Sequence, residues 1–367
     1  MRVALLELRR KPGRFAVVAV ALVLLSLLLL FLGALLDGLF LNSTGAIRSV
    51  DADGIVFSAD ARQSFLRSSI DDATRQSIES VDGVGETGGL GISLLGVTIP
   101  GEDDVADGAV AGYELGSSSL PAPPPPGDAY ADRRLEEFGA EVGQTLLIGP
   151  AEVPLRIIGW VDDTNYLLQN GLWVEPDTWR QVQNQNRPDA PVVPGEFQTL
   201  VVRDTEGTDT GTVLADIDEQ TGVTESLTET EAVFAVPGIT EQEQTFTAVI
   251  GVTVFVSGLV VALFFALLTI ERTGLYAVLK AIGAPSRTLV LGVVVQSTVV
   301  AVVSFAIGAG ITYLLAQVIP PSVPAQFELD RAAFTLLAVV VASVIGALIS
   351  LRRIVNIDPA SAIGAGV

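Results

Sequence analysis

Four long apolar runs dominate the pattern of hydrophobic and polar positions. They are Phe15–Leu36, Phe246–Ile270, Leu289–Ile319 and Ala332–Leu351, and none of them contains a charged residue. Because about 20 apolar residues cross a bilayer as a helix, the pattern predicts four transmembrane helices. The first run exceeds the core of about 7–15 residues that is typical of a signal peptide, and no small-residue cleavage site follows it, so we expect a retained anchor.

Basic residues gather at one side of these runs. Arg2, Arg9, Arg10, Lys11 and Arg14 precede the first run, Arg272, Lys280 and Arg287 separate the second from the third, and Arg352 and Arg353 follow the fourth. The positive-inside rule therefore predicts that both termini and the segment 271–288 are cytoplasmic. The remainder keeps 11 of the 21 Lys and Arg and 39 of the 42 Asp and Glu, a net charge of −28. So acidic an external part argues against a nucleic-acid partner.

The expected architecture is an α-helical integral membrane protein with four transmembrane helices and an external α+β domain, in the bacterial inner or plasma membrane. Its predicted parts follow in chain order: cytoplasmic N-terminus 1–14, transmembrane helix 15–40, external domain 41–245, transmembrane helix 246–270, cytoplasmic segment 271–288, transmembrane helix 289–319, external loop 320–331, transmembrane helix 332–351 and cytoplasmic tail 352–367.

The external stretch alternates short branched or aromatic runs with Gly, Pro and Asp, which is typical of strands. We expect strands at 54–59, 90–99, 146–148, 155–161, 172–174 and 198–202, and helices at 71–81 and 210–220. The proline run 121–126 is stiff enough to divide the domain in two.

The residue types argue against catalysis and bound cofactors in this chain. Histidine and cysteine are both absent, which removes the usual general base, thiol nucleophile and metal ligands. Lys11 precedes Pro12 and Lys280 precedes Ala281, so neither lysine belongs to a nucleotide-binding P-loop. Acidic clusters at 51–53 and 102–107 lack the spacing of a calcium loop. We therefore expect no catalytic, cofactor or metal site, and ATP and Mg²⁺ to be bound by a partner.

The predicted membrane helices contain no ionisable residue in their middle, and only Asp37 lies near an end. Such groups usually mark ion coupling, so a proton or ion pump is not indicated. Small and neutral polar residues favour close packing of the helices, partly between two copies of the chain. The glycines concerned are Gly251, Gly258, Gly308, Gly310 and Gly346.

The segment 271–288 combines an apolar stripe with basic residues. Leu275, Val278, Leu279 and Ile282 recur at helical spacing, and Gly283 with Pro285 ends the pattern. A helix of this kind lies on a membrane surface or inserts into a groove of a partner protein, while a plain basic linker is the alternative.

The same segment resembles a motif of the FtsX/MacB-like family of ABC transporter permeases, E-R-x-x-E-[IY]-[GA]-x-[LM]-[RK]-A-[IL]-G-A. The matching positions are Glu271, Arg272, Tyr276, Ala277, Leu279, Lys280, Ala281, Ile282, Gly283 and Ala284. Leu275 departs from it, because the family usually has an acidic residue there. The form of the motif is closest to the DevC/HrtB branch. Two further similarities to this family lie elsewhere in the chain. The tail 358–363 (DPASAI) is similar to the closing pattern of the family, and the segments 142–146 and 156–161 together are similar to a pattern of the MacB-like periplasmic core.

The resemblance implies a non-catalytic permease that works as a homodimer with a separate ATPase subunit. It assigns ATPase coupling to Glu271, Arg272, Leu275, Tyr276, Leu279, Lys280, Ile282 and Gly283. Three functions stay open: export or extraction of a substrate at the outer face, FtsX-like force transmission to an external cell-wall hydrolase, and a membrane-anchored external enzyme. An external adaptor or hydrolase is a further partner under the first two.

Overall fold

The chain forms two compact units in the computed structural model, which describes residues 12–271, 285–320 and 323–355. One unit, called the helical unit below, comprises Met1–Gly38 and Glu243–Val367. The other, called the α+β domain, comprises Leu39–Gln242.

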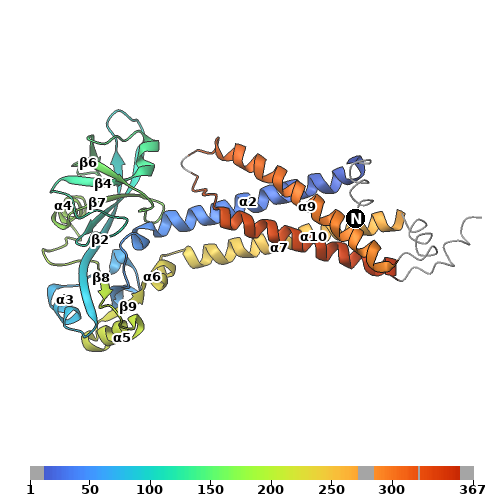
Figure 1. Cartoon of the computed structure of the whole chain (residues 1–367). Coiled ribbons are helices and arrows are strands. Elements are labelled where there is room, and N and C mark those ends of the chain that lie inside the picture. The colour runs from blue at the N-terminus through green and yellow to red at the C-terminus, as the bar shows by residue number, and fades with distance from the viewer. Residues whose placement is uncertain (1–11, 272–284, 321–322, 356–367) are drawn as a thin grey trace, which may run out of the picture. The chain divides into compact units, whose positions relative to one another are not determined.

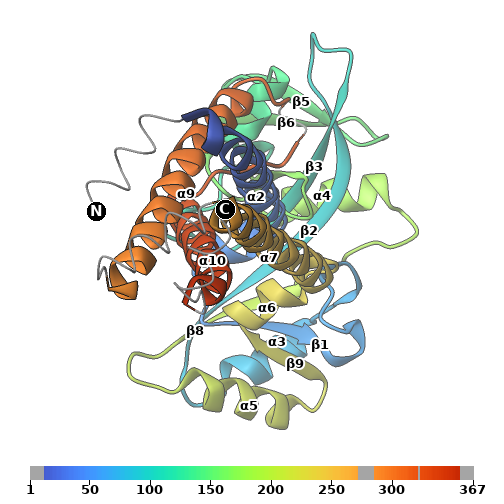
Figure 2. The ribbon, with the colours of Figure 1, turned by 90° about the vertical axis from the view of Figure 1, so that its right-hand side faces the viewer.

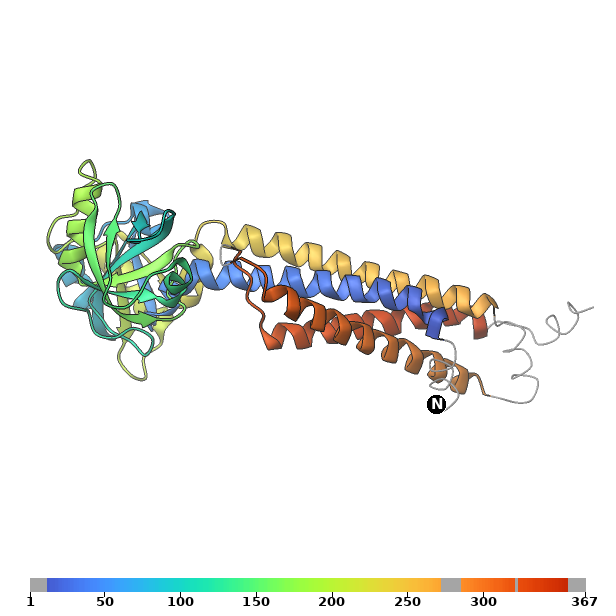
Figure 3. The ribbon, with the colours of Figure 1, turned by 90° about the horizontal axis from the view of Figure 1, so that it is seen from above.

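In the described part of the helical unit there are four helices, and they lie side by side in Figures 1 and 3. They are α2 (Pro12–Arg48), α7 (Ile239–Glu271), α9 (Ser286–Ala316) and α10 (Leu329–Val355). Each is long and apolar enough to cross a membrane. The predicted fold class, four transmembrane helices with an α+β domain, is therefore confirmed.

Each of these helices extends beyond its predicted span at one end or both, and α7, for example, begins at Ile239 and not at Phe246. Helix α2 continues past residue 40 to Arg48, because hydrogen bonds from the α+β domain hold its last turns, as described below. Helix α10 begins at Leu329, so Arg331 lies in its first turn and not in a loop. Asp37 of α2 offsets the charge of Arg331 there with a contact of 2.5 Å.

Small residues set the contacts between the four helices. A Cβ atom on Gly346 of α10 would lie 2.2 Å from the carbonyl oxygen of Gly258 on α7, so these two backbones touch. A Cβ atom on Gly308 of α9 would lie 3.1 Å from the carbonyl oxygen of Val23 on α2. The Phe15 ring of α2 packs on Phe264 of α7, with centroids 5.6 Å apart. Figure 2 looks along the helices and shows α2 flanked by α9 and α7.

Nine strands form one sheet in the α+β domain. They are β1 (Gly54–Ser58), β2 (Val84–Thr98), β3 (Val105–Tyr113), β4 (Asp128–Asp132), β5 (Thr145–Ile148), β6 (Val153–Val161), β7 (Asn170–Val174), β8 (Thr199–Asp204) and β9 (Thr224–Thr228). Their order is β3-β7-β4-β6-β5-β2-β8-β1-β9, and β3 also pairs with β2. This extra pairing closes six strands into a ring, while β8, β1 and β9 continue from β2 as an open sheet.

The long strand β2 belongs to both parts of the sheet and is visible as a curved ribbon in Figure 2. The core on the ring side includes Trp179, which lies directly on sheet glycines. Cβ atoms on Gly91 and Gly112 would lie 2.2 Å and 2.4 Å from its side chain, so only glycine fits at these two positions.

The short helices of the domain are α3 (Asp72–Glu79), α4 (Pro176–Asn186), α5 (Thr210–Thr221) and α6 (Glu229–Ala235), with 3₁₀ turns at Ala59–Ala61, Phe65–Arg67 and Arg133–Phe138. Helices α3 and α5 share an apolar core with β1 and β8, in which Ile78, Ile217 and Val56 are fully buried. The capping residues Asp71 and Asp209 accept hydrogen bonds from Thr74 N and Thr212 N, which fixes where these helices begin.

The strands and the two helices predicted in this domain are confirmed, although three strands and two helices were missed: β3, β4, β9, α4 and α6. The predicted division at the proline run 121–126 is wrong. The strands before and after it, β3 and β4, both belong to the ring, and Tyr113 Oη donates a hydrogen bond to Pro121 O at 2.9 Å. The run is a connection that packs on the domain.

Candidate functional site

The predicted coupling segment joins two membrane-length helices. Of the eight predicted coupling residues, only Glu271 belongs to the part of the chain that the structure describes, as the exposed last residue of α7. Helix α9 begins at Ser286 after Pro285 in an extended conformation. The other predicted coupling residues lie outside the described residues: Arg272, Leu275, Tyr276, Leu279, Lys280, Ile282 and Gly283.

The glycines expected to pack helices fall into two groups. Gly258, Gly308 and Gly346 lie against neighbouring helices of the same chain. Cβ atoms on Gly251 of α7 and Gly310 of α9 would meet nothing within 4 Å among the described residues. These two positions leave room for lipid or for a second copy of the chain.

The helical unit contains three buried hydroxyl groups that have no hydrogen-bond partner among the described residues: those of Ser26, Ser304 and Ser343. In contrast, Ser257 Oγ donates to Thr253 O and Thr312 Oγ1 donates to Gly308 O, both at 2.9 Å. Burying a hydroxyl without a hydrogen-bond partner costs free energy. Each of these three serines therefore lowers the stability of the helix packing around it.

The last turns of α2 are held by the loop that joins β6 to β7, residues 162–169, here called the clamp loop. Leu168 N donates to Asn42 O and Leu167 N to Ser43 O, both at 3.1 Å, and Ala46 N donates to Asn165 O at 2.9 Å. The clamp loop thus forms hydrogen bonds with backbone N–H and C=O groups of α2. In an isolated helix, these groups would bond to each other between residues i and i−4.

Two further features fix this contact. Arg48 forms a bidentate ion pair with Asp163, with distances of 2.7 Å and 2.8 Å. Gly45 lets the clamp loop approach, because a Cβ atom there would lie 2.6 Å from Asp163 O. The backbone of Asp163, Leu167 and Leu168 is left-handed, with φ of 57°, 50° and 67°. Such conformations persist only where the surroundings hold them, as the helix does here.

Asp132 ties the clamp loop to the sheet. Its carboxylate accepts hydrogen bonds from Thr164 N and Thr164 Oγ1, at 2.8 Å and 2.9 Å. Burial raises the pKa of this carboxyl above its ordinary value, although these hydrogen bonds work in the opposite direction. The clamp loop is therefore hydrogen-bonded to a buried carboxyl group.

The sequence gives only an indirect indication of this clamp. Asn42, Gly45 and Arg48 continue the first apolar run at helical spacing, and Asp163 lies just after a strand. Their contact spans 115 positions between Arg48 and Asp163. A local sequence pattern cannot predict an ion pair between residues so far apart in the chain.

The two acidic clusters of the α+β domain differ in their contacts, and the cluster at 51–53 accepts hydrogen bonds from the backbone. Asp51 Oδ2 accepts from Ser118 N and Asp53 Oδ2 accepts from Asp204 N, each at 2.8 Å. The pKa of Asp51 is lowered by the hydrogen bonds from Ser118. The acids at 102–104 and 107 are exposed. Among the described residues, no group of three or more Asp or Glu is placed to hold a metal ion.

A family model and several known proteins match part of this chain. Residues 247–359 match the family model described as FtsX-like permease C-terminal. The "Putative hemin transport system permease protein HrtB" of Staphylococcus epidermidis is 28% identical over 111 residues, 30% of this chain and 32% of that protein. The uncharacterized ABC transporter permease Rv2563 of Mycobacterium tuberculosis is 39% identical over 112 residues, 30% of this chain and 31% of that protein.

The matched region spans about a third of the length of these relatives. The periplasmic region of MacB from Actinobacillus actinomycetemcomitans aligns with 52% of this chain and 96% of its own length, at a TM-score of 0.35 and 10% identity. The membrane part of the chain, residues 247–359, thus resembles the C-terminal membrane part of FtsX-like ABC transporter permeases.

Proposed function

We propose that this chain is the transmembrane subunit of an ABC transporter that couples ATP hydrolysis by a separate ATPase to export or extraction of a substrate at the outer face. The observation that carries the proposal is the family match over residues 247–359, because this range includes the amphipathic segment between α7 and α9. In this proposal the eight predicted coupling residues contact the ATPase, which binds ATP and Mg²⁺.

The proposed topology places both termini and the 271–288 segment in the cytoplasm and the α+β domain outside. The basic residues around the apolar runs support it. Two copies of the chain are proposed to associate in the membrane, since ATPases of this class act in pairs, and the open surface at Gly251 offers room for a second copy.

Helix α2 is the proposed path of force to the α+β domain. It is one continuous helix from Pro12 to Arg48. Its last turns are hydrogen-bonded to the clamp loop, whose ends are β6 and β7 of the ring. A displacement of the last turns of α2 would therefore be passed to these two strands through direct hydrogen bonds.

The alternative, regulation of an external cell-wall hydrolase, would be favoured by a surface rich in tryptophan. Trp173 and Trp179 are fully buried, and Trp160 is partly buried. An apolar pocket in the helical unit, described in the next subsection, instead favours a function that handles lipophilic molecules.

The test is to purify the chain with and without an ABC ATPase subunit from the same genome and to measure ATP turnover in lipid nanodiscs. We expect no turnover from the chain alone and a stable complex whose turnover exceeds that of the isolated ATPase. Hydrolysis by the chain without a partner would contradict the assignment.

A further inference from the structure

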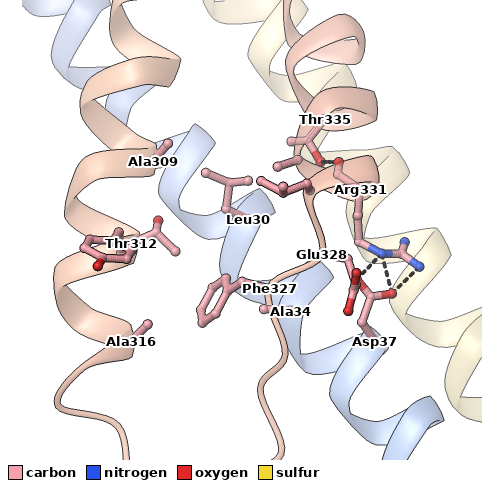
Figure 4. A pocket seen from close by; sticks show the side chains of 13 residues that line it. Leu30, Ala34, Asp37, Ala309, Thr312, Ala316, Phe327, Glu328, Arg331 and Thr335 are labelled. Atoms are coloured by element: carbon pink, nitrogen blue, oxygen red, sulfur yellow. Dashed lines mark hydrogen bonds and ion pairs between the residues drawn. The ribbon is translucent and has the colours of Figure 1, made fainter.

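The helical unit contains a pocket of about 430 Å³, within the range of about 300–1,000 Å³ that ligand sites occupy. Helix α2, helix α9, the start of α10 and the residues just before it line this pocket. Figure 4 shows Leu30, Ala309 and Phe327 around the same space, with Asp37 and Arg331 at one end.

The wall formed by the residues before α10 is fixed to α2. Gln326 N donates a hydrogen bond to Ala34 O at 2.9 Å. Gly38 allows the close approach, because a Cβ atom there would lie 1.9 Å from Pro324 O. The pocket is therefore built by the chain itself and does not need a ligand to hold it open.

Most of the pocket wall is apolar. Its two threonines direct their hydroxyl groups to their own helices: Thr312 Oγ1 donates to Gly308 O at 2.9 Å, and Thr335 Oγ1 donates to Arg331 O at 2.8 Å. The other walls there are alanine, leucine and aromatic side chains. A polar group entering this space would lose water without replacement, whereas an alkyl chain would gain from burial.

One end of the pocket is charged. Arg331 Nε donates to both carboxylate oxygens of Asp37, at 2.5 Å and 2.6 Å, and Nη2 lies 2.5 Å from Oδ1. Among the described residues this pairing leaves Nη1 available on a side chain that is 39% exposed. A guanidinium edge of this kind matches a phosphate group.

A second carboxylate at this end of the pocket affects which phosphate-bearing head group can bind. Glu328 also lines the pocket and is exposed. With Asp37 and Arg331 it gives this end of the pocket an excess of one negative charge, which opposes a purely anionic ligand. A head group that carries an ammonium beside its phosphate meets both requirements.

We propose that this pocket binds one amine-bearing phospholipid of the surrounding membrane. One acyl chain fills the space between α2 and α9, the phosphate accepts from Arg331 Nη1, and the ammonium lies near Glu328.

The experiment is native mass spectrometry of the full chain in detergent, titrated with phosphatidylethanolamine or with phosphatidylglycerol. Wild type is expected to retain one phosphatidylethanolamine and to bind phosphatidylglycerol more weakly. Ala309→Phe fills the pocket and should weaken phosphatidylethanolamine binding about tenfold or more, since the acyl chain loses its site. Ala306→Phe, the same change at an exposed position of α9, is the matched control and should bind like wild type.

Glu328→Gln tests the head group without touching the packed interior. It should reduce the preference for phosphatidylethanolamine over phosphatidylglycerol while the protein stays folded. Equal binding of the two lipids by wild type, or unchanged binding in folded Ala309→Phe, would overturn the proposal. These readouts need no ATPase, so their failure would leave the proposed transport function untouched.

Discussion

At position 45 a missing side chain decides how the α+β domain holds α2. A Cβ atom there would lie 2.6 Å from Asp163 O and 2.9 Å from Asn165 N, both of them backbone atoms of the clamp loop. Backbone atoms cannot rotate away as the end of a side chain can. The contact between helix and loop thus depends on glycine.

Gly45→Ala should therefore destabilise the α+β domain by about 1–3 kcal/mol, as overpacking does elsewhere. The measurement is thermal unfolding of the full chain followed by tryptophan fluorescence, because Trp160, Trp173 and Trp179 all belong to this domain. Gly211→Ala in α5 is the control, since the nearest atom to its Cβ would be 3.5 Å away. Equal melting temperatures of the two variants would show that the clamp loop yields easily.

Asp132 gives a prediction about pH. Because burial raises its pKa in the folded state, the folded protein binds this proton more tightly than the unfolded chain does. Its contribution to the free energy of unfolding is therefore largest in acid and falls as the pH rises from the unfolded value of about 3.9 through the raised folded value.

Asp132→Asn removes this titration. The quantity to compare is the melting temperature of the variant minus that of wild type. This difference should be more positive at pH 7 than at pH 3.5, whatever the absolute stability of the variant. The same tryptophan melts measure it. A difference between variant and wild type that is constant with pH, or that changes in the opposite direction, would contradict the buried charge beneath the clamp loop.

At the scale of elements, apolar length and basic flanks predicted the four membrane helices because these signals are local. Helix α4 was missed because it carries only Trp179 and Val182 as buried apolar side chains, although Glu175 as cap and Pro176 in its first turn indicated its start. Strand β3 was missed because it is built largely of alanine and glycine, which fit close packing and have weak strand propensity.

The clamp and the pocket could not be read from the sequence for a different reason. Asp37 stands out in the sequence as a charge near the end of an apolar run, but its pairing with Arg331 joins residues 294 positions apart. The sequence identifies which residues carry charge, and only the packing of α2 against α10 shows that the two charges meet. The same holds for Arg48 and Asp163.

Helix α7 gives a prediction about association. Its residue Phe255 is 71% exposed and lies one turn from Gly251, where a Cβ atom would meet nothing within 4 Å among the described residues. A large ring beside a gap suits pairing of two copies, each ring filling the gap of the other.

Because the chain has no cysteine, single cysteines report this contact without background. Gly251→Cys should form disulfide-linked dimers in membranes under mild oxidation. Gly310→Cys, on α9 and equally open, is the matched control and should stay monomeric. Efficient cross-linking at 310 but not at 251 would move the interface to α9.

At the scale of the whole molecule, the proposed topology predicts which positions a membrane-impermeant thiol reagent reaches in intact cells. Ser119→Cys lies at an exposed position of the α+β domain and should be labelled. Lys280→Cys, in the proposed cytoplasmic segment, should be labelled only after the membrane is permeabilised. The reverse pattern would invert the orientation and place the coupling segment out of reach of an ATPase.

In the proposed function the segment between α7 and α9 transmits force from an ATPase, and its apolar residues Leu279 and Ile282 form the contact. If these side chains insert into a groove of the partner, changing both to Asp buries unpaired charge at the contact and should cost several kcal/mol, roughly 3–5, of binding. Lys280→Ala is the control, since a partly exposed cation contributes under about 1 kcal/mol.

The measurement is co-purification of the ATPase with the full chain and the ATP turnover of the complex, with membrane insertion of each variant checked in parallel. The double variant Leu279→Asp, Ile282→Asp is expected to lose the ATPase and the stimulated turnover, while Lys280→Ala keeps most of both. Normal complex formation and turnover by the inserted double variant would contradict the coupling role of this segment and the proposed function with it.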